Sequence, residues 1–373
     1  MRFAGDSTTL MALLRQMPSC EIVSRKFMRI AFIWMVGLAC MLPLSACKDA
    51  PSEPIAGADT TSHSILWKVD TLGTHGSALL GISAVSPTSI YAVGVIWDAS
   101  GKIPTFVIHW DGVKWNEMRD DSLNWWIGAG AAIGVHAISD TALYVVGSRV
   151  IDRDALPMIA RWDGKRWKNI TPQTPSLITT VWANSVTSVY AMGTKGRVLH
   201  YDGSLWNELN SPTQLDFCDA VGLPGGEIYA VACNQFNSYL GGTVAKISGG
   251  DVTTAFSQSI GRTLGIGGTS ARDLYAVGDG VLHLGAEGTW ETISVPDENV
   301  TLYGVAADQS NNVVILGAYG RTVHWSGESW SSYETMYDRA SSTKYYRAIV
   351  TGGRYFLVGD TGSRALLATG TVK

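Results

Sequence analysis

After residue 63, the apolar residues of this chain occur in short runs separated by glycine and polar turn residues. The clearest runs share a Tyr-Ala-Val-Gly core, which recurs with small changes. The cores are Tyr91–Gly94, Tyr144–Gly147, Tyr190–Gly193, Tyr229–Ala232, Tyr275–Gly278, Val314–Gly317 and Phe356–Gly359. No stretch after residue 47 has the i, i+3, i+4, i+7 spacing of a long amphipathic helix. The pattern predicts seven copies of one unit built from short strands.

A second motif follows most of these cores: an aromatic residue, then Asp-Gly, then a tryptophan. It is present at Trp110–Trp115, Trp162–Trp167 and Tyr201–Trp206, is kept in frame at Trp325–Trp330, and is shortened at Glu287–Trp290. Asp-Gly between two β-prone runs is typical of a two-residue hairpin with a type I′ turn, which needs positive φ at both central residues. We therefore expect a hairpin at each motif, with its flanking aromatic side chains paired across the two strands.

Each unit thus predicts four strands, here named A to D in chain order. Strand A of the first unit is Leu80–Val85, strand B holds the Tyr-Ala-Val-Gly core, and strands C and D flank the Asp-Gly turn. Successive cores lie 39 to 53 residues apart, close to the roughly 40–50 residues of a four-stranded propeller blade. We predict an all-β fold, a seven-bladed β-propeller over residues 64–373. Eight blades, a β-helix and a two-domain sandwich are the alternatives.

The two ends of this region complement each other. The seventh unit has strands at Tyr346–Val350, Tyr355–Val358 and Arg364–Ala368, and it lacks a strand D. Ile65–Val69 has the pattern of a strand D with no blade before it. We expect this N-terminal strand to complete the last blade and close the ring, which would cover two open sheet edges.

Residues 1–46 have the features of a signal peptide rather than of a domain. Arg25, Lys26 and Arg29 precede an apolar run from Ile30 to Leu44, which is shorter than the roughly 20 residues of a membrane-spanning helix. A start at Met28 would give a signal of ordinary length. Residues 47–63, rich in Ser, Pro, Thr and Ala, predict a flexible tether.

The end of the signal segment, Leu44-Ser45-Ala46-Cys47, resembles the bacterial lipobox. The resemblance implies that Cys47 is acylated and becomes the mature N-terminus, which anchors the protein to a membrane. We therefore expect an outer-membrane lipoprotein of the bacterial cell envelope, either periplasmic or exposed at the surface. The alternatives are ordinary secretion and a plain membrane anchor in which Cys47 has no role.

Over residues 65–373 the repeat resembles a family of bacterial propeller lipoproteins of largely unassigned role. The units lack the Gly-His and Trp-Asp pair of WD40 blades and the double glycine of kelch blades. The sialidase-type aspartate box is only faintly similar to Ala286–Trp290. The resemblance therefore implies an architecture more than an activity.

Composition and charge exclude some classes of function. The formal net charge is -4, which gives no electrostatic reason to expect a nucleic-acid partner. The chain contains no Gly-x-Ser-x-Gly, His-Glu-x-x-His or phosphate-binding loop, and we predict no cofactor. Four histidines occupy equivalent places in different units and would lie too far apart to share a metal ion. They are His109, His200, His283 and His324.

Two cysteines, Cys218 and Cys233, remain after Cys47. They are placed almost symmetrically about Pro224–Glu227, which we interpret as a turn between strands A and B of the fourth unit. An exported protein meets oxidising conditions, so we predict a disulfide that acts as a structural staple. The alternative is a pair of buried free thiols.

Departures from the repeat indicate where a ligand could bind. The B–C connections are long in units one, two and four, and loops on a rigid scaffold often carry function. Rigid aromatic side chains beside charged groups suit a sugar or a protein hot spot. The candidate binding residues are Trp97, Asp98, Trp125, Trp126, Arg149, Asp152, Arg153, Tyr345 and Tyr346. The alternative is that these aromatics only cover the end of the ring.

Two function hypotheses follow. The first is a membrane-anchored binding or scaffolding propeller without enzymatic activity, which engages a protein or a glycan through its loops. The second is an extracytoplasmic glycan hydrolase or lyase, which would need two carboxylates about 5–10 Å apart. Asp98, Asp152 and Asp154 are the only obvious carboxylates for that chemistry.

Overall fold

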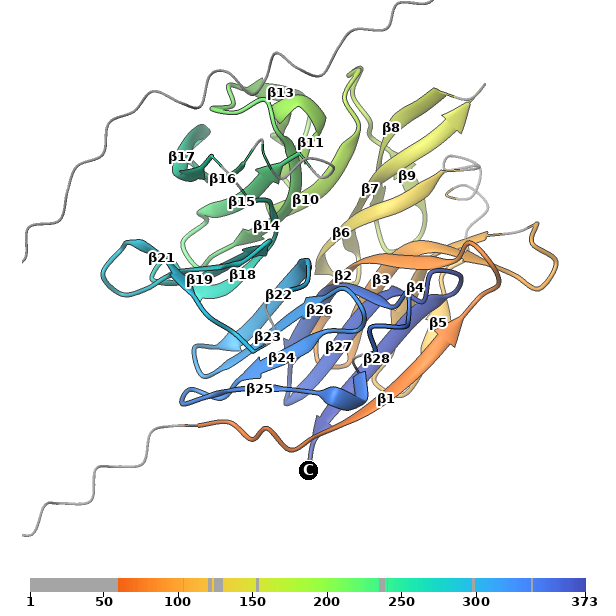
Figure 1. The fold of residues 1–373 in the computed structure, drawn as a ribbon. Coiled ribbons are helices and arrows are strands. Elements are labelled where there is room, and N and C mark those ends of the chain that lie inside the picture. The colour runs from red at the N-terminus through yellow and green to blue at the C-terminus, as the bar shows by residue number, and fades with distance from the viewer. Residues whose placement is uncertain are drawn as a thin grey trace, which may run out of the picture. The chain divides into compact units, whose positions relative to one another are not determined.

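The computed structural model describes residues 60–102, 104–119, 123, 130–151, 154–234, 239, 241–259, 261–296, 299–336 and 338–373. These residues form seven four-stranded antiparallel sheets around a common centre, so the prediction of a seven-bladed β-propeller is confirmed (Figure 1). The signal segment, Cys47 and most of the tether lie outside the described residues. Within the described residues, no helix is long and apolar enough to span a bilayer.

The first three blades follow the chain in order. Blade one contains β2 (Ala78–Ser86), β3 (Ser89–Trp97), β4 (Pro104–Trp110) and β5 (Trp115–Glu117). Blade two contains β6 (Ala131–Ser139), β7 (Ala142–Ile151), β8 (Asp154–Trp162) and β9 (Trp167–Asn169). Blade three contains β10 (Ile178–Ser185), β11 (Ser188–Gly193), β12 (Val198–Tyr201) and β13 (Trp206–Leu209), with the short helix η1 (Thr194–Gly196) between β11 and β12.

Blades four to six repeat this arrangement. Blade four contains β14 (Asp216–Gly222), β15 (Ile228–Cys233), β16 (Gly242–Ser248) and β17 (Asp251–Gln258). Blade five contains β18 (Thr263–Ser270), β19 (Asp273–Gly278), β20 (Val281–Leu284) and β21 (Trp290–Ile293). Blade six contains β22 (Leu302–Gln309), β23 (Asn312–Gly317), β24 (Thr322–Trp325) and β25 (Trp330–Ser332), and the short helix η3 (Glu334–Met336) follows it.

The seventh blade joins the two ends of the described chain. It contains β26 (Lys344–Thr351), β27 (Arg354–Asp360) and β28 (Ala365–Val372). The fourth strand is β1 (Ile65–Leu72), which lies antiparallel to β28 with Ile65 opposite Val372 and Leu72 opposite Ala365. A strand from the start of the propeller thus forms the outer edge of the last blade.

The innermost strands contact one another around the whole ring. β2 contacts β6, and the sequence of contacts continues through β10, β14, β18, β22 and β26 back to β2. Glycines allow this close approach: a Cβ at Gly265 would lie 2.5 Å from the Tyr303 carbonyl oxygen, and one at Gly304 would lie 2.4 Å from that of Tyr346. The small residues of the predicted A strands are therefore a requirement of the crowded centre.

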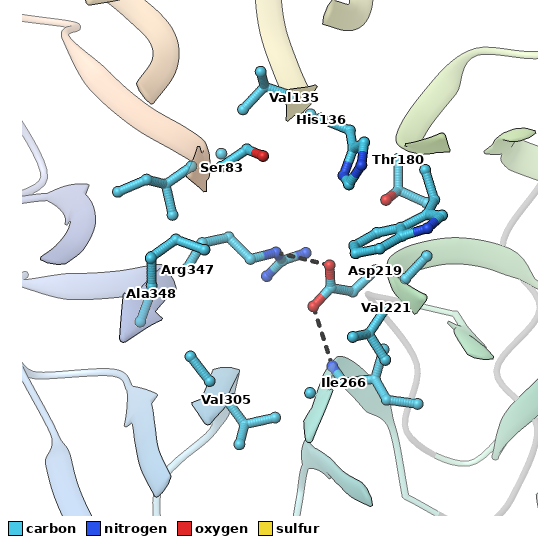
Figure 2. Close-up of a pocket in the computed structure, with 18 of the residues that line it drawn as sticks. Ser83, Val135, His136, Thr180, Asp219, Val221, Ile266, Val305, Arg347 and Ala348 are labelled. Atoms are coloured by element: carbon cyan, nitrogen blue, oxygen red, sulfur yellow. Dashed lines mark hydrogen bonds and ion pairs between the residues drawn. The ribbon is translucent and has the colours of Figure 1, made fainter. Parts of the chain in front are cut away.

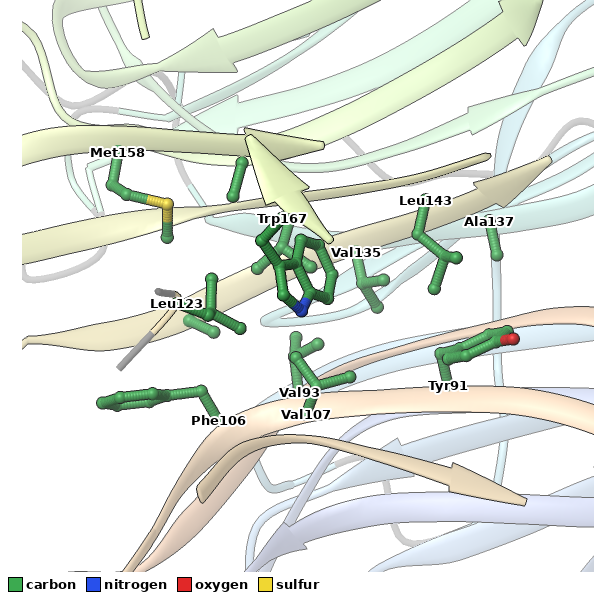
Figure 3. Packing of buried hydrophobic residues seen from close by; sticks show 13 residues of the cluster. Tyr91, Val93, Phe106, Val107, Leu123, Val135, Ala137, Leu143, Met158 and Trp167 are labelled. Carbon is green, nitrogen blue, oxygen red and sulfur yellow. The ribbon is translucent and has the colours of Figure 1, made fainter. Parts of the chain in front are cut away.

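Apolar side chains fill the space between neighbouring blades. Between blades one and two, Trp167 is 2 % exposed and lies among apolar residues from both sheets, including Val93, Val107 and Val135 (Figure 3). Similar clusters lie between the other adjacent blades. Neither face of one sheet could be buried without its neighbours, so the stability of each blade depends on the ring.

The Asp-Gly hairpins form where predicted, but with a different turn. Trp110 lies opposite Trp115, and Trp162 lies opposite Trp167, so the aromatic pairing across the hairpins is confirmed. At the turn only Gly112 has positive φ, at 94°, whereas a type I′ turn needs positive φ at both central residues. The predicted type I′ turn is wrong because Asp111 precedes the central pair.

The aspartate has a separate role in this turn. The Asp111 Oδ1 atom accepts hydrogen bonds from the backbone N–H groups of Val113 and Lys114, both at 2.9 Å. These bonds lower the pKa of Asp111 to about 2, because they stabilise its charged form. Asp163 and Asp202 bond their turns in the same way. The three aspartates are turn-forming residues, as the sequence predicted.

Three of the four equivalent histidines have a repeated structural role. His109 stacks on Tyr91 of the neighbouring strand with ring centroids 4.4 Å apart. The pairs Tyr190–His200 and Tyr275–His283 have the same geometry. His324 differs because Val314 occupies the place of the tyrosine, and it contacts the segment before β1 instead.

Candidate functional site

The connections of the blades lie at two different ends of the ring. We call the end with the B–C and D–A connections the loop face; it includes the B–C connections that begin at Trp97 and at Ile151. We call the end with the A–B and C–D turns the turn face; it includes the turn at Asp111–Lys114. The long B–C connections of blades one and two therefore lie at the same end, as the predicted site requires.

Trp97 and Asp98 lie at the loop face of blade one. The Trp97 backbone N–H donates to the Ser77 hydroxyl at 3.0 Å, and the Asp98 Oδ1 atom accepts from the Ser100 hydroxyl at 2.7 Å. A surface cavity of about 360 Å³ lies beside them. Its lining is Gly73, Thr74, Ile96, Trp97, Asp98, Ala99, Glu117 and Arg119.

The blade-two connection is a strand extension rather than a loop. Residues Ser148–Pro157, predicted as a loop, continue β7 and β8 with Arg149 opposite Leu156 and Ile151 opposite Asp154. The loop prediction is wrong because the two segments pair along their whole length. We call residues 149–156 the blade-two hairpin; Val150 and Ile151 on it are 39 % and 44 % exposed. The predicted binding residues Asp152, Arg153, Trp125 and Trp126 lie outside the described residues.

The two tyrosines predicted before blade seven have different environments. Tyr345 is 1 % exposed and belongs to the apolar cluster between blades six and seven, so its prediction as a ligand-binding residue is corrected. Tyr346 is half-buried, and its hydroxyl donates to the Asp360 Oδ2 atom at 2.5 Å. Its ring lies edge-on to Tyr303 with centroids 5.4 Å apart. Tyr346 is the extra residue at a register shift between Tyr345 and Arg347, so its side chain does not share the buried position of Tyr345.

A second loop-face cavity, of about 390 Å³, lies over blades five to seven. We call it the tyrosine pocket. Its lining is Asn299, Val300, Thr301, Tyr303, Ala318, Tyr319, Ser341, Ser342, Thr343 and Lys344. Of these ten residues, only Lys344 belongs to the polar-aromatic stretch before blade seven that includes the predicted Tyr345 and Tyr346; the other nine were not predicted, because none belongs to an insertion in the repeat.

The centre of the ring contains a further cavity of about 240 Å³, lined by the innermost strands of all seven blades. The residue just after the bulge of each innermost strand is charged in two blades and small in the other five. The seven residues are Gly81, Gly134, Thr180, Asp219, Gly265, Gly304 and Arg347. Asp219 and Arg347 are the only charged side chains among the described residues that line this cavity.

Arg347 of blade seven and Asp219 of blade four lie against each other in this central cavity, which we call the channel (Figure 2). The Arg347 Nε atom lies 3.2 Å from Asp219 Oδ1, and the Ile266 backbone N–H donates to Asp219 Oδ2 at 3.1 Å. Arg347 also donates to the backbone oxygens of Cys218 at 2.7 Å and Tyr303 at 2.9 Å. Burial raises the pKa of Asp219, and the Arg347 charge opposes that shift.

An imidazole and an indole lie on the wall of the same channel. The His136 and Trp182 rings have centroids 4.0 Å apart. Burial lowers the pKa of His136 to about 4, so this imidazole is neutral at pH 7. Trp182 reaches over Gly222 of the next blade, where a Cβ would lie 2.0 Å from its Nε1 atom, and that N–H donates to Asn184 at 3.1 Å.

The predicted cysteine pair lies beside this channel. The Cys218 and Cys233 sulfurs are buried and 3.4 Å apart, and no disulfide joins them in the structure. The hydrogen bond with Cys218 and burial both raise the pKa of Cys233, so both disfavour the thiolate form of this residue. The expected proximity across the hairpin is present, and the disulfide itself stays a prediction.

The arrangement of the metal-binding and carboxylate side chains bears on the catalytic hypothesis. No group of three or more His, Cys, Asp or Glu side chains is arranged to hold a metal ion among the described residues. The described lining of the channel has one carboxylate, Asp219, and it is paired with Arg347. Of the carboxylates considered for glycan chemistry, Asp98 bonds within its own connection, Asp154 lies on the blade-two hairpin, and Asp152 is outside the described residues.

Sequence reasoning missed the channel residues, although a signal for them exists. Aligning the seven A strands on their bulges gives glycine or threonine at five positions and a charged residue at Asp219 and Arg347. The search for irregular features was confined to the connections, so this irregular position within the strands was not found.

No protein-family model matches this chain, and no curated protein matches it. Solved propellers match it over most of their length. YCF48 bound to a D1 peptide has a TM-score of 0.61 and 16 % identity, covering 82 % of this chain and 97 % of that chain. Virginiamycin B lyase from Staphylococcus aureus has a TM-score of 0.62 and 13 % identity, covering 83 % and 100 %. The WD40 propeller domain of Doa1 has a TM-score of 0.56 and 12 % identity, covering 82 % and 97 %. At these identities the similarity shows the β-propeller fold alone.

Proposed function

We propose that this chain is a lipid-anchored, extracytoplasmic propeller that binds a protein or a glycan through its loop face. The observation that carries the proposal is that irregular features gather at that end of the ring. The blade-two hairpin exposes Val150 and Ile151 there, and cavities of about 360 and 390 Å³ open beside Trp97 and Tyr319. Exposed apolar side chains and polar-aromatic cavities are both typical of interaction sites.

The comparisons are compatible with this proposal without specifying a ligand. One similar propeller, YCF48, is bound to a D1 peptide, and others are a virginiamycin B lyase and a streptogramin B lyase. A glycan-active enzyme is the alternative, and it would need a second carboxylate near Asp219 or an active pair on the loop connections. Binding without turnover is the function that we propose.

The lipid anchor is part of the same proposal. Cys47 follows a signal segment and precedes a tether of about 15 residues before the first strand, long enough to hold the propeller away from a membrane. Multiple acyl chains make such anchoring durable. A Cys47→Ser variant is expected to move from the membrane fraction to the soluble fraction of an expressing cell.

The binding test uses anchored protein in native envelopes, followed by cross-linking and capture. A Val150→Asp/Ile151→Asp variant is expected to lose at least about tenfold of the captured partner, because two charges would be added to the exposed hairpin. Val113→Asp is the matched control, since Val113 is 83 % exposed on the turn face. Equal capture by wild type and the hairpin variant, with unchanged thermal unfolding, would refute binding through this hairpin.

A further inference from the structure

The tyrosine pocket is a preformed cavity whose walls are three connections of the loop face. The Ala318 N–H donates to the Thr301 oxygen at 2.9 Å, and the Gly320 N–H donates to the Thr343 oxygen at 3.0 Å. These bonds join the B–C turn of blade six to the linkers on either side of that blade. Because backbone hydrogen bonds already hold these connections in place, little further conformational entropy is lost when a ligand binds.

The backbone does not require a tyrosine at position 319. Tyr319 has a φ of 59° in the turn Gly317–Arg321, and Lys195 has the same φ in the equivalent turn Gly193–Arg197 of blade three. Both turns close with a bond from the first glycine N–H to the arginine oxygen, at 2.9 Å and 3.0 Å. Since lysine serves the same turn, the 40 % exposed Tyr319 ring is available for a function other than folding.

The charge in the pocket is positive. Lys344 is the only charged side chain among its described lining residues. Asp360 faces Lys344 across β26 and β27, but its oxygens already accept from the Tyr346 hydroxyl and the Gly362 N–H, both at 2.5 Å. Asp279 is paired with Arg262 at 2.5 Å. The nearby carboxylates therefore have partners, and the Lys344 ammonium favours an anionic group in the cavity.

Hydroxyl groups line the remainder of the pocket. They belong to Thr301, Ser341, Ser342 and Thr343, and the Tyr303 and Tyr319 rings lie among them. A pyranose ring has hydroxyls at its edge and an apolar face, which match hydroxyl partners and an aromatic platform. The volume of about 390 Å³ lies within the range of small-ligand sites.

We propose that the tyrosine pocket binds a uronic acid residue of an acidic glycan, with the sugar face on Tyr319 and the carboxylate at Lys344. The inference rests on the proposed function, since it makes the loop face a ligand-binding surface, and it narrows the ligand to one class. Lys344 and the pocket hydroxyls would supply a charge-assisted bond and neutral bonds to that sugar.

The experiment measures binding of trigalacturonic acid and of its methyl ester by calorimetry, using the intact protein. The acid is expected to bind, and the ester, which keeps the shape and loses the charge, is expected to bind at least about tenfold more weakly. Lys344→Gln should produce a similar loss for the acid and a small change for the ester. Equal binding of acid and ester would overturn the role of Lys344.

Tyr319→Asn removes the ring without adding a charge, and asparagine tolerates the positive φ of this position, so the turn should still form. This variant is expected to lose at least about tenfold in affinity for the acid. Lys195→Gln is the control on the equivalent turn and should bind as wild type does. Absence of acid binding by wild type, or equal losses in both turns, would refute the proposal. Inorganic phosphate that displaces the acid with equal affinity would show a general anion site and would also refute it.

The hairpin interface and the uronic acid site can be refuted independently of each other. The Val150→Asp/Ile151→Asp variant leaves the tyrosine pocket intact and should bind the acid as wild type does. Loss of partner capture in that variant with unchanged binding of the acid supports both proposals. Unchanged capture with acid binding refutes the hairpin interface and keeps the uronic acid site.

Discussion

At the residue scale, two imidazoles meet where the segment before β1 lies on blade six. The His63 and His324 Nδ1 atoms are 2.9 Å apart, and His324 Nε2 lies 2.9 Å from Asn312 Oδ1. The Asn312 amide nitrogen donates to Asp308 at 2.8 Å, so its oxygen must accept from His324. His324 therefore carries its proton on Nε2, and its Nδ1 accepts the proton of His63.

This arrangement has no place for a second proton, which predicts a pH-dependent stability. Burial and the neighbouring His63 lower the pKa of His324 to about 4, and burial also lowers the pKa of His63. An unfolded histidine with a pKa of about 6.5 takes up a proton first as the pH falls, so folding stability is lost between pH 6.5 and 4. We expect His324 alone to contribute about 2 kcal/mol of the loss between pH 7 and pH 5.

Urea unfolding of wild type and His324→Leu at both pH values measures this effect. The variant should be less stable at pH 7, because Asn312 and Tyr355 lose a partner. Its stability should also change less between pH 7 and pH 5 than that of wild type. His136 remains in both proteins and cancels from the comparison. Parallel pH profiles for the two proteins would contradict the assignment.

At the element scale, the hairpin of β14 and β15 brings two thiols together through an irregularity in pairing. Asp216 lies opposite Cys233 and Phe217 opposite Ala232, and a register shift follows at Cys218. The shift turns the Cys218 sulfur toward Cys233, 3.4 Å away. A disulfide needs an S–S distance of about 2.05 Å, so a small side-chain adjustment would suffice.

We predict that refolding in a mixture of oxidised and reduced glutathione joins Cys218 to Cys233. The bond would close a loop with a sequence separation of 15 residues and add about 3 kcal/mol of stability by the chain-entropy model. Non-reducing peptide mapping and urea unfolding with and without reductant measure the two effects. A Cys218→Ser/Cys233→Ser variant should show no dependence on reductant. Recovery of two alkylatable thiols after oxidative refolding would contradict the prediction.

The repeated sequence motifs correctly predicted the strands and hairpins that recur from blade to blade. The Tyr-Ala-Val-Gly cores form second strands such as β3 and β7, and the aromatic pairs flank hairpins as expected. The blade-two hairpin was predicted as a loop because Arg149, Asp152 and Arg153 interrupt its apolar pattern. Backbone pairing there continues beyond the buried part of the blade. The apolar pattern of a sequence reports burial, so it does not reveal such an extension.

At the scale of the whole molecule, sequence patterns predicted the ring but not what lies at its centre. The channel pair comes from blades four and seven, and Asp219 and Arg347 are 128 residues apart in sequence. Nothing local to either residue indicates a partner. Tyr345 and Tyr346 gave the converse error, since two adjacent aromatics looked equivalent until β26 sent one into the core. A site whose residues come from distant blades can be recognised only when the arrangement of the blades in the ring is known.

Arg347 ties the ring together across its channel, and this predicts a large cost for its removal. The side chain bonds to backbone of blades four, six and seven and to the Asp219 carboxylate. The Arg347 and Asp219 side chains are 24 % and 13 % exposed, so water screens this ion pair only weakly. Removal of one partner of a buried pair costs about 3–5 kcal/mol, and partial exposure lowers this to about 2–4 kcal/mol.

We therefore expect Arg347→Met to lower the free energy of unfolding by about 2–4 kcal/mol, because Asp219 would remain buried without its counter-charge. Arg347→Met/Asp219→Leu should be more stable than Arg347→Met, since it leaves no unpaired charge in the channel. Lys68→Met is the control: Lys68 pairs with Asp70 on the surface, where it is 77 % exposed, and such pairs contribute about 0–1 kcal/mol. Urea unfolding of the three variants decides the point. If Arg347→Met and Lys68→Met cost the same, the channel pair does not hold the blades together, and the ring depends on the apolar clusters between neighbouring blades alone.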